Sequence, residues 1–88
     1  MKSFTTADFW KAYTKLSPEL KKKAKNAYQL WEENQGHPSL RFKKVGKNLW
    51  SVRITNDYRA LAIKKGEDYY WFWLGSHAEY DQLIRHSL

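Results

Sequence analysis

The residues best able to do chemistry lie in the second half of the chain. Arg53 and Arg59 stand among apolar residues of predicted strands, and His77 and Tyr80 follow the last of these strands. An arginine inside an apolar strand is costly unless it pairs with an anion or lines a binding site. A histidine titrates near neutral pH and can therefore exchange protons, whereas the arginine guanidinium fits phosphate oxygens. The sequence thus directs the search for a functional site to this half.

The balance of charge is strongly basic. The formal net charge is +7 on 88 residues, and the isoelectric point lies near 9.7. This favours a polyanion or a strongly acidic protein as partner, with a merely solvated basic surface as the alternative. The lysine-rich segment 21–25 is interpreted as a solvated helix face rather than a nucleic-acid footprint, because no aromatic residue interleaves it for base stacking.

Length and composition favour one small domain over residues 1–88. Aromatic residues make up 17% of the chain, which helps a domain of this size to build a core. The chain has no cysteine, so it has neither disulfides nor thiolate metal sites. Neither a secretory leader nor an apolar run long enough to span a membrane is visible, and a cytoplasmic location is expected.

Two helices are predicted in the first half, after a short lead over residues 2–4. Thr5 or Thr6 can cap the first helix, and the run Ser17-Pro18-Glu19 provides a cap, a proline and an acid for the second. The apolar stripe of the first helix contains Phe9, Tyr13 and Leu16, and that of the second contains Leu20, Ala24, Ala27, Tyr28 and Trp31. The helices are expected to form a hairpin that packs on a sheet.

Strand patterns follow, at residues 40–45, 49–54, 58–63 and 69–74. The last of these is apolar on both faces, as expected for a central strand covered on each side. Ser76 and Glu79 have the spacing of a capping box, which predicts a final helix from His77. Helices followed by strands favour an α+β fold with a mainly antiparallel sheet of about four strands and a short C-terminal helix.

Several of these segments together resemble the RelE/ParE superfamily of type II toxin–antitoxin toxins. The resemblance rests on Leu49-Trp50-x-x-Arg53-Ile54, on Tyr58-Arg59, and on the strand ending Leu74-Gly75-Ser76-His77 with Tyr80 after it. The junction Leu16-Ser17-Pro18 and the order of elements extend it over the whole chain. The superfamily includes ribosome-dependent mRNA endonucleases, gyrase-inhibiting members and members without a known target.

The resemblance implies a ribosome-dependent mRNA endonuclease as the first interpretation. Attack of a 2′-hydroxyl on the adjacent phosphate needs a base, an acid and cations that stabilise the developing charge, but no metal or other cofactor. The expected catalytic residues are Arg59, His77, Tyr80 and Arg53. The expected RNA-binding residues are Arg41, Lys43 and Lys44.

Two other functions stay open, namely inhibition of DNA gyrase by protein–protein contact and a non-catalytic RNA-binding relic of the fold. Ala78 and Glu79 follow the histidine where many nuclease members carry further basic residues, and Glu79 lowers the positive potential there. The arginines could instead pair with acids on the sheet or contact an antitoxin, and Tyr80 could belong to the core.

The toxin interpretations imply a cognate antitoxin as partner, expected to be acidic and partly disordered. An amphipathic helix of this antitoxin is expected in the apolar groove between the helical hairpin and the sheet. The further expected partners are the ribosome with its mRNA, or alternatively DNA gyrase, and no membrane.

Overall fold

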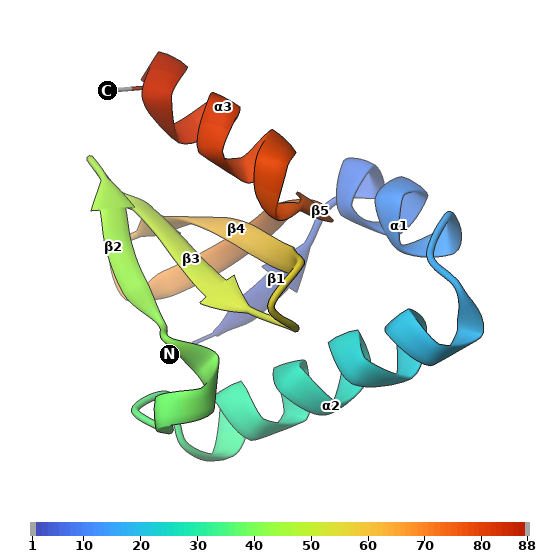
Figure 1. The fold of residues 1–88 in the computed structure, drawn as a ribbon. Coiled ribbons are helices and arrows are strands. Elements are labelled where there is room, and N and C mark those ends of the chain that lie inside the picture. Colours follow the sequence, from blue (N-terminus) through green and yellow to red (C-terminus); the bar gives the residue numbers. More distant parts are fainter. Residues whose placement is uncertain (1, 88) are drawn as a thin grey trace.

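The fold is α+β, with helices on both sides of one mixed sheet (Figure 1). A computed structural model describes residues 2–87. The elements in chain order are β1 (Ser3–Thr5), α1 (Ala7–Thr14), α2 (Pro18–Glu33), the 3-10 helix η1 (Pro38–Leu40), β2 (Lys43–Gly46), β3 (Leu49–Arg53), β4 (Tyr58–Lys65), β5 (Asp68–Ser76) and α3 (His77–Ser87).

The sheet has five strands in the order β1-β5-β4-β3-β2. Strands β2 to β5 form an antiparallel meander, which confirms the predicted mainly antiparallel sheet. Strand β1 pairs parallel with β5, Ser3 opposite Tyr69, where the sequence predicts only a short lead over residues 2–4. Three residues are too few to display the alternation by which strands are recognised.

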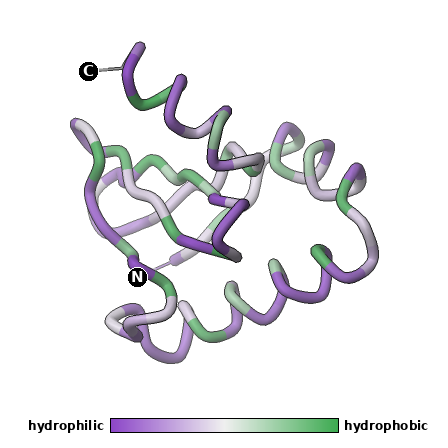
Figure 2. Tube along the Cα trace, viewed as in Figure 1, coloured by the Kyte–Doolittle hydropathy of each residue, from purple (hydrophilic) through white to green (hydrophobic). Residues whose placement is uncertain are grey.

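Both N-terminal helices begin where their caps predict. The Thr6 hydroxyl accepts from the backbone N–H of Phe9 at 3.3 Å, and the Ser17 hydroxyl accepts from that of Leu20 at 3.2 Å. Helix α1 ends at Thr14, so Leu16 lies in the turn before α2 rather than in the helix, although it still packs against the core. Hydrophobic and hydrophilic residues alternate along α2 with the helical turn (Figure 2).

The core is aromatic and centres on Trp31, whose residue surface is 1% exposed. Its ring meets Phe42, Tyr69 and Trp71 edge-on, with centroids 5.2–5.6 Å apart. Such edge-to-face pairs add stabilisation to the burial of their large apolar surfaces. The core therefore fixes α2 against β5, the strand from which the candidate site continues into α3.

The predicted strand over residues 40–45 begins three residues too early. Leu40 instead ends η1 and is buried, and Arg41 adopts a left-handed conformation with a φ of 45°. A left-handed residue cannot continue a strand, so β2 starts only at Lys43. The following turn is as expected, because Asn48, at a φ of 58°, is a residue type that tolerates this region.

Helix α3 starts at His77, as the capping box predicts, and lies on the side of the sheet opposite α2 (Figure 1). The Ser76 hydroxyl accepts from the backbone N–H of Glu79 at 3.3 Å, and a Glu79 carboxylate oxygen accepts from the backbone N–H of Ser76 at 3.3 Å. Strand β5 is thus covered on both faces, as its apolar sequence indicates. Within residues 2–87, no helix has the length and hydrophobicity needed to cross a bilayer.

Candidate functional site

The two predicted phosphate-binding arginines lie directly opposite each other at the ends of β3 and β4. The antiparallel register pairs Arg53 with Arg59 and, two residues away, Ser51 with Leu61. Directly opposed residues of an antiparallel pair share one face of the sheet. Tyr80 of α3 contacts Ser51, so this face is the one that α3 covers. The pairing puts two guanidinium groups at one corner of the sheet.

The Arg59 guanidinium folds back onto the turn that joins β3 to β4. Its Nη1 donates to the backbone carbonyls of Tyr58 at 3.0 Å and of Asn56 at 3.3 Å. The same nitrogen makes a shorter hydrogen bond to the backbone carbonyl of Thr55. Three carbonyl acceptors on one nitrogen hold both the side chain and the turn in place. Arg59 therefore has a structural role in addition to any role towards a ligand.

A cluster of three arginines surrounds this corner. Burial lowers the pKa of the Arg59 guanidinium below its ordinary value, and the charges of Arg53 and Arg41 lower it further. Tyr80 and Asp81 act on the same pKa in the opposite direction. Arginine nevertheless stays protonated in proteins, so the three like charges remain and favour an anionic ligand. We call Arg41, Arg53 and Arg59 the arginine cluster.

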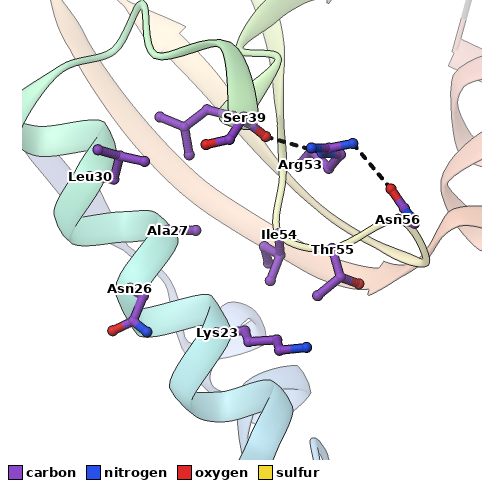
Figure 3. Close-up of a pocket in the computed structure, with 10 residues that line it drawn as sticks. Lys23, Asn26, Ala27, Leu30, Ser39, Arg53, Ile54, Thr55 and Asn56 are labelled. Atoms are coloured by element: carbon purple, nitrogen blue, oxygen red, sulfur yellow. Dashed lines mark hydrogen bonds between the residues drawn. The ribbon is translucent and has the colours of Figure 1, made fainter.

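The Arg53 side chain is held by hydrogen bonds to two segments, η1 and the turn after β3. Its Nε donates to the carbonyl of Ser39 at 3.1 Å, and its Nη1 donates to Oδ1 of Asn56 at 3.1 Å (Figure 3). It also lines a pocket of about 430 Å³ between α2, η1 and the turn after β3, which we call the α2–β3 pocket. Arg53 thus connects the arginine cluster to a cavity on its flank.

His77 occupies the first position of α3, close to the β3–β4 turn. Its backbone N–H donates to the carbonyl of Asp57 at 2.6 Å, and its Nδ1 lies 3.2 Å from Oδ2 of Asp81. The side chain is 45% exposed, so a ligand can reach it. A carboxylate on one ring nitrogen orients an imidazole and leaves the other nitrogen to exchange a proton.

Tyr80 is buried, in contrast to His77. It is 7% exposed, and its hydroxyl donates to the Ser51 hydroxyl at 3.1 Å. Its ring lies 5.8 Å from that of His77, centroid to centroid. The geometry gives Tyr80 a part in the packing of α3 on the sheet, on the face that carries Arg53 and Arg59.

The predicted RNA-binding residues divide between the two faces of the sheet. Lys43 pairs with Ser51 and therefore shares the face of the arginine cluster, whereas Lys44 pairs with Trp50 and lies on the opposite face. Both lysines are exposed. Arg41 precedes the strand and acts on Arg59. The structure brings Arg41 and Lys43 to the site and separates Lys44 from it.

Three residues beside the site were not predicted as site residues, namely Ser51, Asn56 and Asp81. Asp81 follows His77 by four positions, a spacing that brings helical side chains together and gave a usable signal. For Ser51 the sequence showed only that it shares a strand face with Arg53. Nothing in the sequence marked Asn56 as the acceptor for Arg53. Within residues 2–87, no three histidine, cysteine, aspartate or glutamate side chains gather closely enough to hold a metal ion.

The architecture is shared with solved structures of bacterial and archaeal toxins. The toxin of the RelB–RelE antitoxin–toxin complex from Methanococcus jannaschii matches with a TM-score of 0.71 at 13% identity, over 91% of this chain and 96% of that one. A YoeB/ParE toxin from Agrobacterium tumefaciens matches with a TM-score of 0.67 at 16% identity, over 88% and 99%. YafQ from E. coli gives 0.68 at 13%, over 89% and 94%. At these identities the likeness establishes the fold.

The family follows from the sequence itself. Residues 18–82 match the model of the ParE-like toxin domain. The chain therefore belongs to the ParE-like toxin domain family and, with it, to the RelE/ParE superfamily of toxin–antitoxin toxins that the sequence resembles. No curated protein matches the sequence.

Proposed function

We propose that this toxin cleaves mRNA on the ribosome and so stops translation. The observation that carries the proposal is the pairing of Arg53 with Arg59 at one corner of the sheet, where the charge of Arg41 also acts, together with the exposed imidazole of His77 at the start of α3. Cations and a group that titrates near neutral pH are the parts that metal-independent cleavage of RNA requires. The protein would then work in the cytoplasm, where ribosomes and mRNA are found.

The proposed reaction moves one proton onto the enzyme and one onto the leaving group. His77 takes the proton of the 2′-hydroxyl, whose oxygen forms a bond to the adjacent phosphorus while the bond from phosphorus to the 5′-oxygen breaks. Arg59 and Arg53 stabilise the charge that develops on the phosphoryl oxygens. Tyr80 supplies the proton for the leaving 5′-oxygen, which requires its hydroxyl to exchange Ser51 for the RNA.

Primer extension on an mRNA that is being translated in a purified system tests this proposal. The wild type is compared with Arg59→Ala and His77→Ala, and with Lys22→Ala as a matched surface variant on α2. We expect new 5′ ends in ribosome-bound message with the wild type and Lys22→Ala, reduced about 100-fold or more in His77→Ala. An intact message with correctly folded wild-type protein would contradict the proposal.

The proposed partner in the resting state is an acidic, partly disordered antitoxin. One structural match is the toxin of an antitoxin–toxin complex, and the net charge of +7 suits an acidic partner. An apolar groove of about 500 Å³ opens between β1, α1 and α2, with Trp10 49% exposed at its rim. An amphipathic antitoxin helix would bury this groove, and Trp10→Asp should weaken the complex in calorimetry.

Inhibition of DNA gyrase is the second candidate, and one observation favours it. Nη1 of Arg59 is bonded to three backbone carbonyls and the Tyr80 hydroxyl to Ser51, so both side chains are held within the fold. A surface whose side chains are held by internal hydrogen bonds can still bind and inhibit another protein without catalysing a reaction. Failure of gyrase to introduce negative supercoils into relaxed plasmid DNA in the presence of the toxin, together with intact mRNA, would support this function. Absence of both effects would leave a non-catalytic RNA-binding module.

A further inference from the structure

The α2–β3 pocket is a cavity beside the proposed active site. Its volume of about 430 Å³ lies in the range of pockets that bind small ligands. Figure 3 shows Lys23 and Ala27 of α2 facing Ile54 and Thr55 across it. Of the residues that line the pocket, Arg53 is the one that also belongs to the arginine cluster, so a ligand in the pocket and one at Arg59 would both lie beside Arg53.

The polar groups that line the pocket favour an anion. They comprise two cations, two carboxamides and two hydroxyls, contributed by Lys23, Arg53, Asn26, Asn56, Ser39 and Thr55. No aspartate or glutamate is among the residues that line it within the part of the chain described. The pocket therefore offers two positive charges and hydrogen-bond donors, and the nearby Glu19 carboxylate pairs with Lys23 without lining the pocket itself.

Arg53 is oriented in advance of binding. Its hydrogen bonds to Ser39 and Asn56 fix the plane of the guanidinium at the pocket wall. A guanidinium has five N–H donors, and these two bonds occupy two of them. A side chain that is already fixed loses little conformational entropy when it binds a ligand.

We infer that the α2–β3 pocket binds a second backbone phosphate of a single-stranded RNA whose neighbouring phosphate lies at Arg59. The inference rests on the proposed action on RNA, because it assigns the two anion sites to one strand. Arg53 and Arg59 are opposed across β3 and β4, which brings their side chains within reach of adjoining groups of one ligand.

The rest of the lining favours RNA over an acidic peptide. Ala27, Leu30 and Ile54 provide an aliphatic floor against which a ribose or a base can lie. The carboxamides of Asn26 and Asn56 both donate and accept, which suits the mixed edges of an unpaired base. A glutamate carboxylate only accepts hydrogen bonds, so it would leave the amide oxygens without a donor.

The test measures binding of a single-stranded RNA hexanucleotide to the full chain by fluorescence anisotropy at several salt concentrations. Lys23→Gln is compared with Lys22→Gln, since both lysines lie on α2 and only Lys23 lines the pocket. Lys23 is also paired with Glu19 at 3.4 Å, an exposed contact whose loss costs little stability. We expect Lys23→Gln to raise the Kd about two- to fivefold and to lower the salt slope by about 0.7.

A second measurement locates the ligand. Backbone amide signals of Asn26, Ser39 and Asn56, and the side-chain amide signals of the two asparagines, should shift in NMR spectra on addition of the hexanucleotide, and less on addition of a glutamate-rich peptide of equal charge. Shifts with the peptide alone, or with neither ligand, would overturn the inference, as would equal Kd values and salt slopes for the two lysine variants.

This result is separable from the outcome for the nuclease. RNA that binds in the pocket while translated mRNA stays intact would support the pocket and contradict cleavage. Cleavage of translated mRNA with no effect of Lys23→Gln on RNA binding would support the nuclease and contradict the pocket.

Discussion

The hydroxyl group of Tyr80 donates a hydrogen bond to that of Ser51 and so ties α3 to β3. Both residues are buried, so each hydroxyl depends on the other for a partner. The tyrosine could serve to pack α3 on the sheet or to transfer a proton to RNA, and loss of this hydrogen bond can distinguish the two roles. The two roles predict different results for one substitution.

Tyr80→Phe should lower the free energy of unfolding by about 1 kcal/mol, because the ring stays and one buried hydrogen bond is lost. Urea titration of the wild type, Tyr80→Phe, Ser51→Ala and the double variant measures the coupling. The double variant should be little worse than either single one. Unchanged cleavage of translated mRNA by Tyr80→Phe would remove the tyrosine from the proposed reaction.

At the level of single residues, the sequence indicated which arginines belong to the candidate site, but it indicated only some of the residues around them. Arg53 and Arg59 could be predicted from their place among apolar strand residues. That they face each other depends on the register of β3 with β4, and the same register separates Lys43 from Lys44. Registers are set by turns and by the core of the whole sheet, which a local pattern does not contain.

Among the elements, the entry into β2 contains backbone strain. Arg41 has a φ of 45°, a conformation that costs a residue with a Cβ roughly 1–2 kcal/mol and that glycine adopts freely. Strained residues of this kind gather at functional sites. The presence of an arginine at this strained position is therefore consistent with its place in the arginine cluster.

Arg41→Gly should raise the free energy of unfolding by about 0.5–1 kcal/mol, since it relieves the strain and removes one of three like charges. The same variant should weaken RNA binding. Asn48→Gly is the control, because an asparagine already tolerates its φ of 58° and should gain less. A loss of stability in Arg41→Gly would show that the side chain makes stabilising contacts that outweigh the strain.

The end of β5 depends on the absence of a side chain at Gly75. A Cβ there would lie 2.5 Å from Cζ2 of Trp73, which is closer than two non-bonded carbon atoms can approach. Gly75→Ala should therefore destabilise the fold by about 1–3 kcal/mol as the Trp73 ring is displaced. Thermal unfolding of Gly75→Ala with and without Trp73→Leu tests the cause, because the smaller side chain should restore part of the loss.

The elements themselves could largely be predicted, and the exceptions share a cause. Thr6, Ser17 and Ser76 mark helix starts through local hydrogen bonds, so their signals lie within a few residues of sequence. Strand β1 has no such signal and exists only because β5 offers an edge for pairing. The turn at Arg41 likewise arises from burial of Leu40 rather than from a glycine or asparagine.

Across the whole molecule, Ser3 connects three elements. Its hydroxyl accepts from the Tyr28 hydroxyl of α2 at 2.7 Å and from the Trp71 indole N–H of β5 at 3.1 Å. Ser3→Ala should lower the free energy of unfolding by about 1–3 kcal/mol, because the N–H of the buried tryptophan loses its acceptor. Thr5→Ala, in the same strand, is the comparison, and equal losses in a urea titration would contradict this assignment.

Strand β1 also constrains the order in which the protein can assemble during synthesis. Lys2 and Asp68, hydrogen-bonded where β1 meets β5, lie 66 residues apart in sequence. Contacts over such separations form late and slowly. The growing chain must therefore expose residues up to α3 before the sheet closes and His77 reaches the arginines. The proposed cleavage of mRNA would therefore begin only after the chain has left the ribosome that made it.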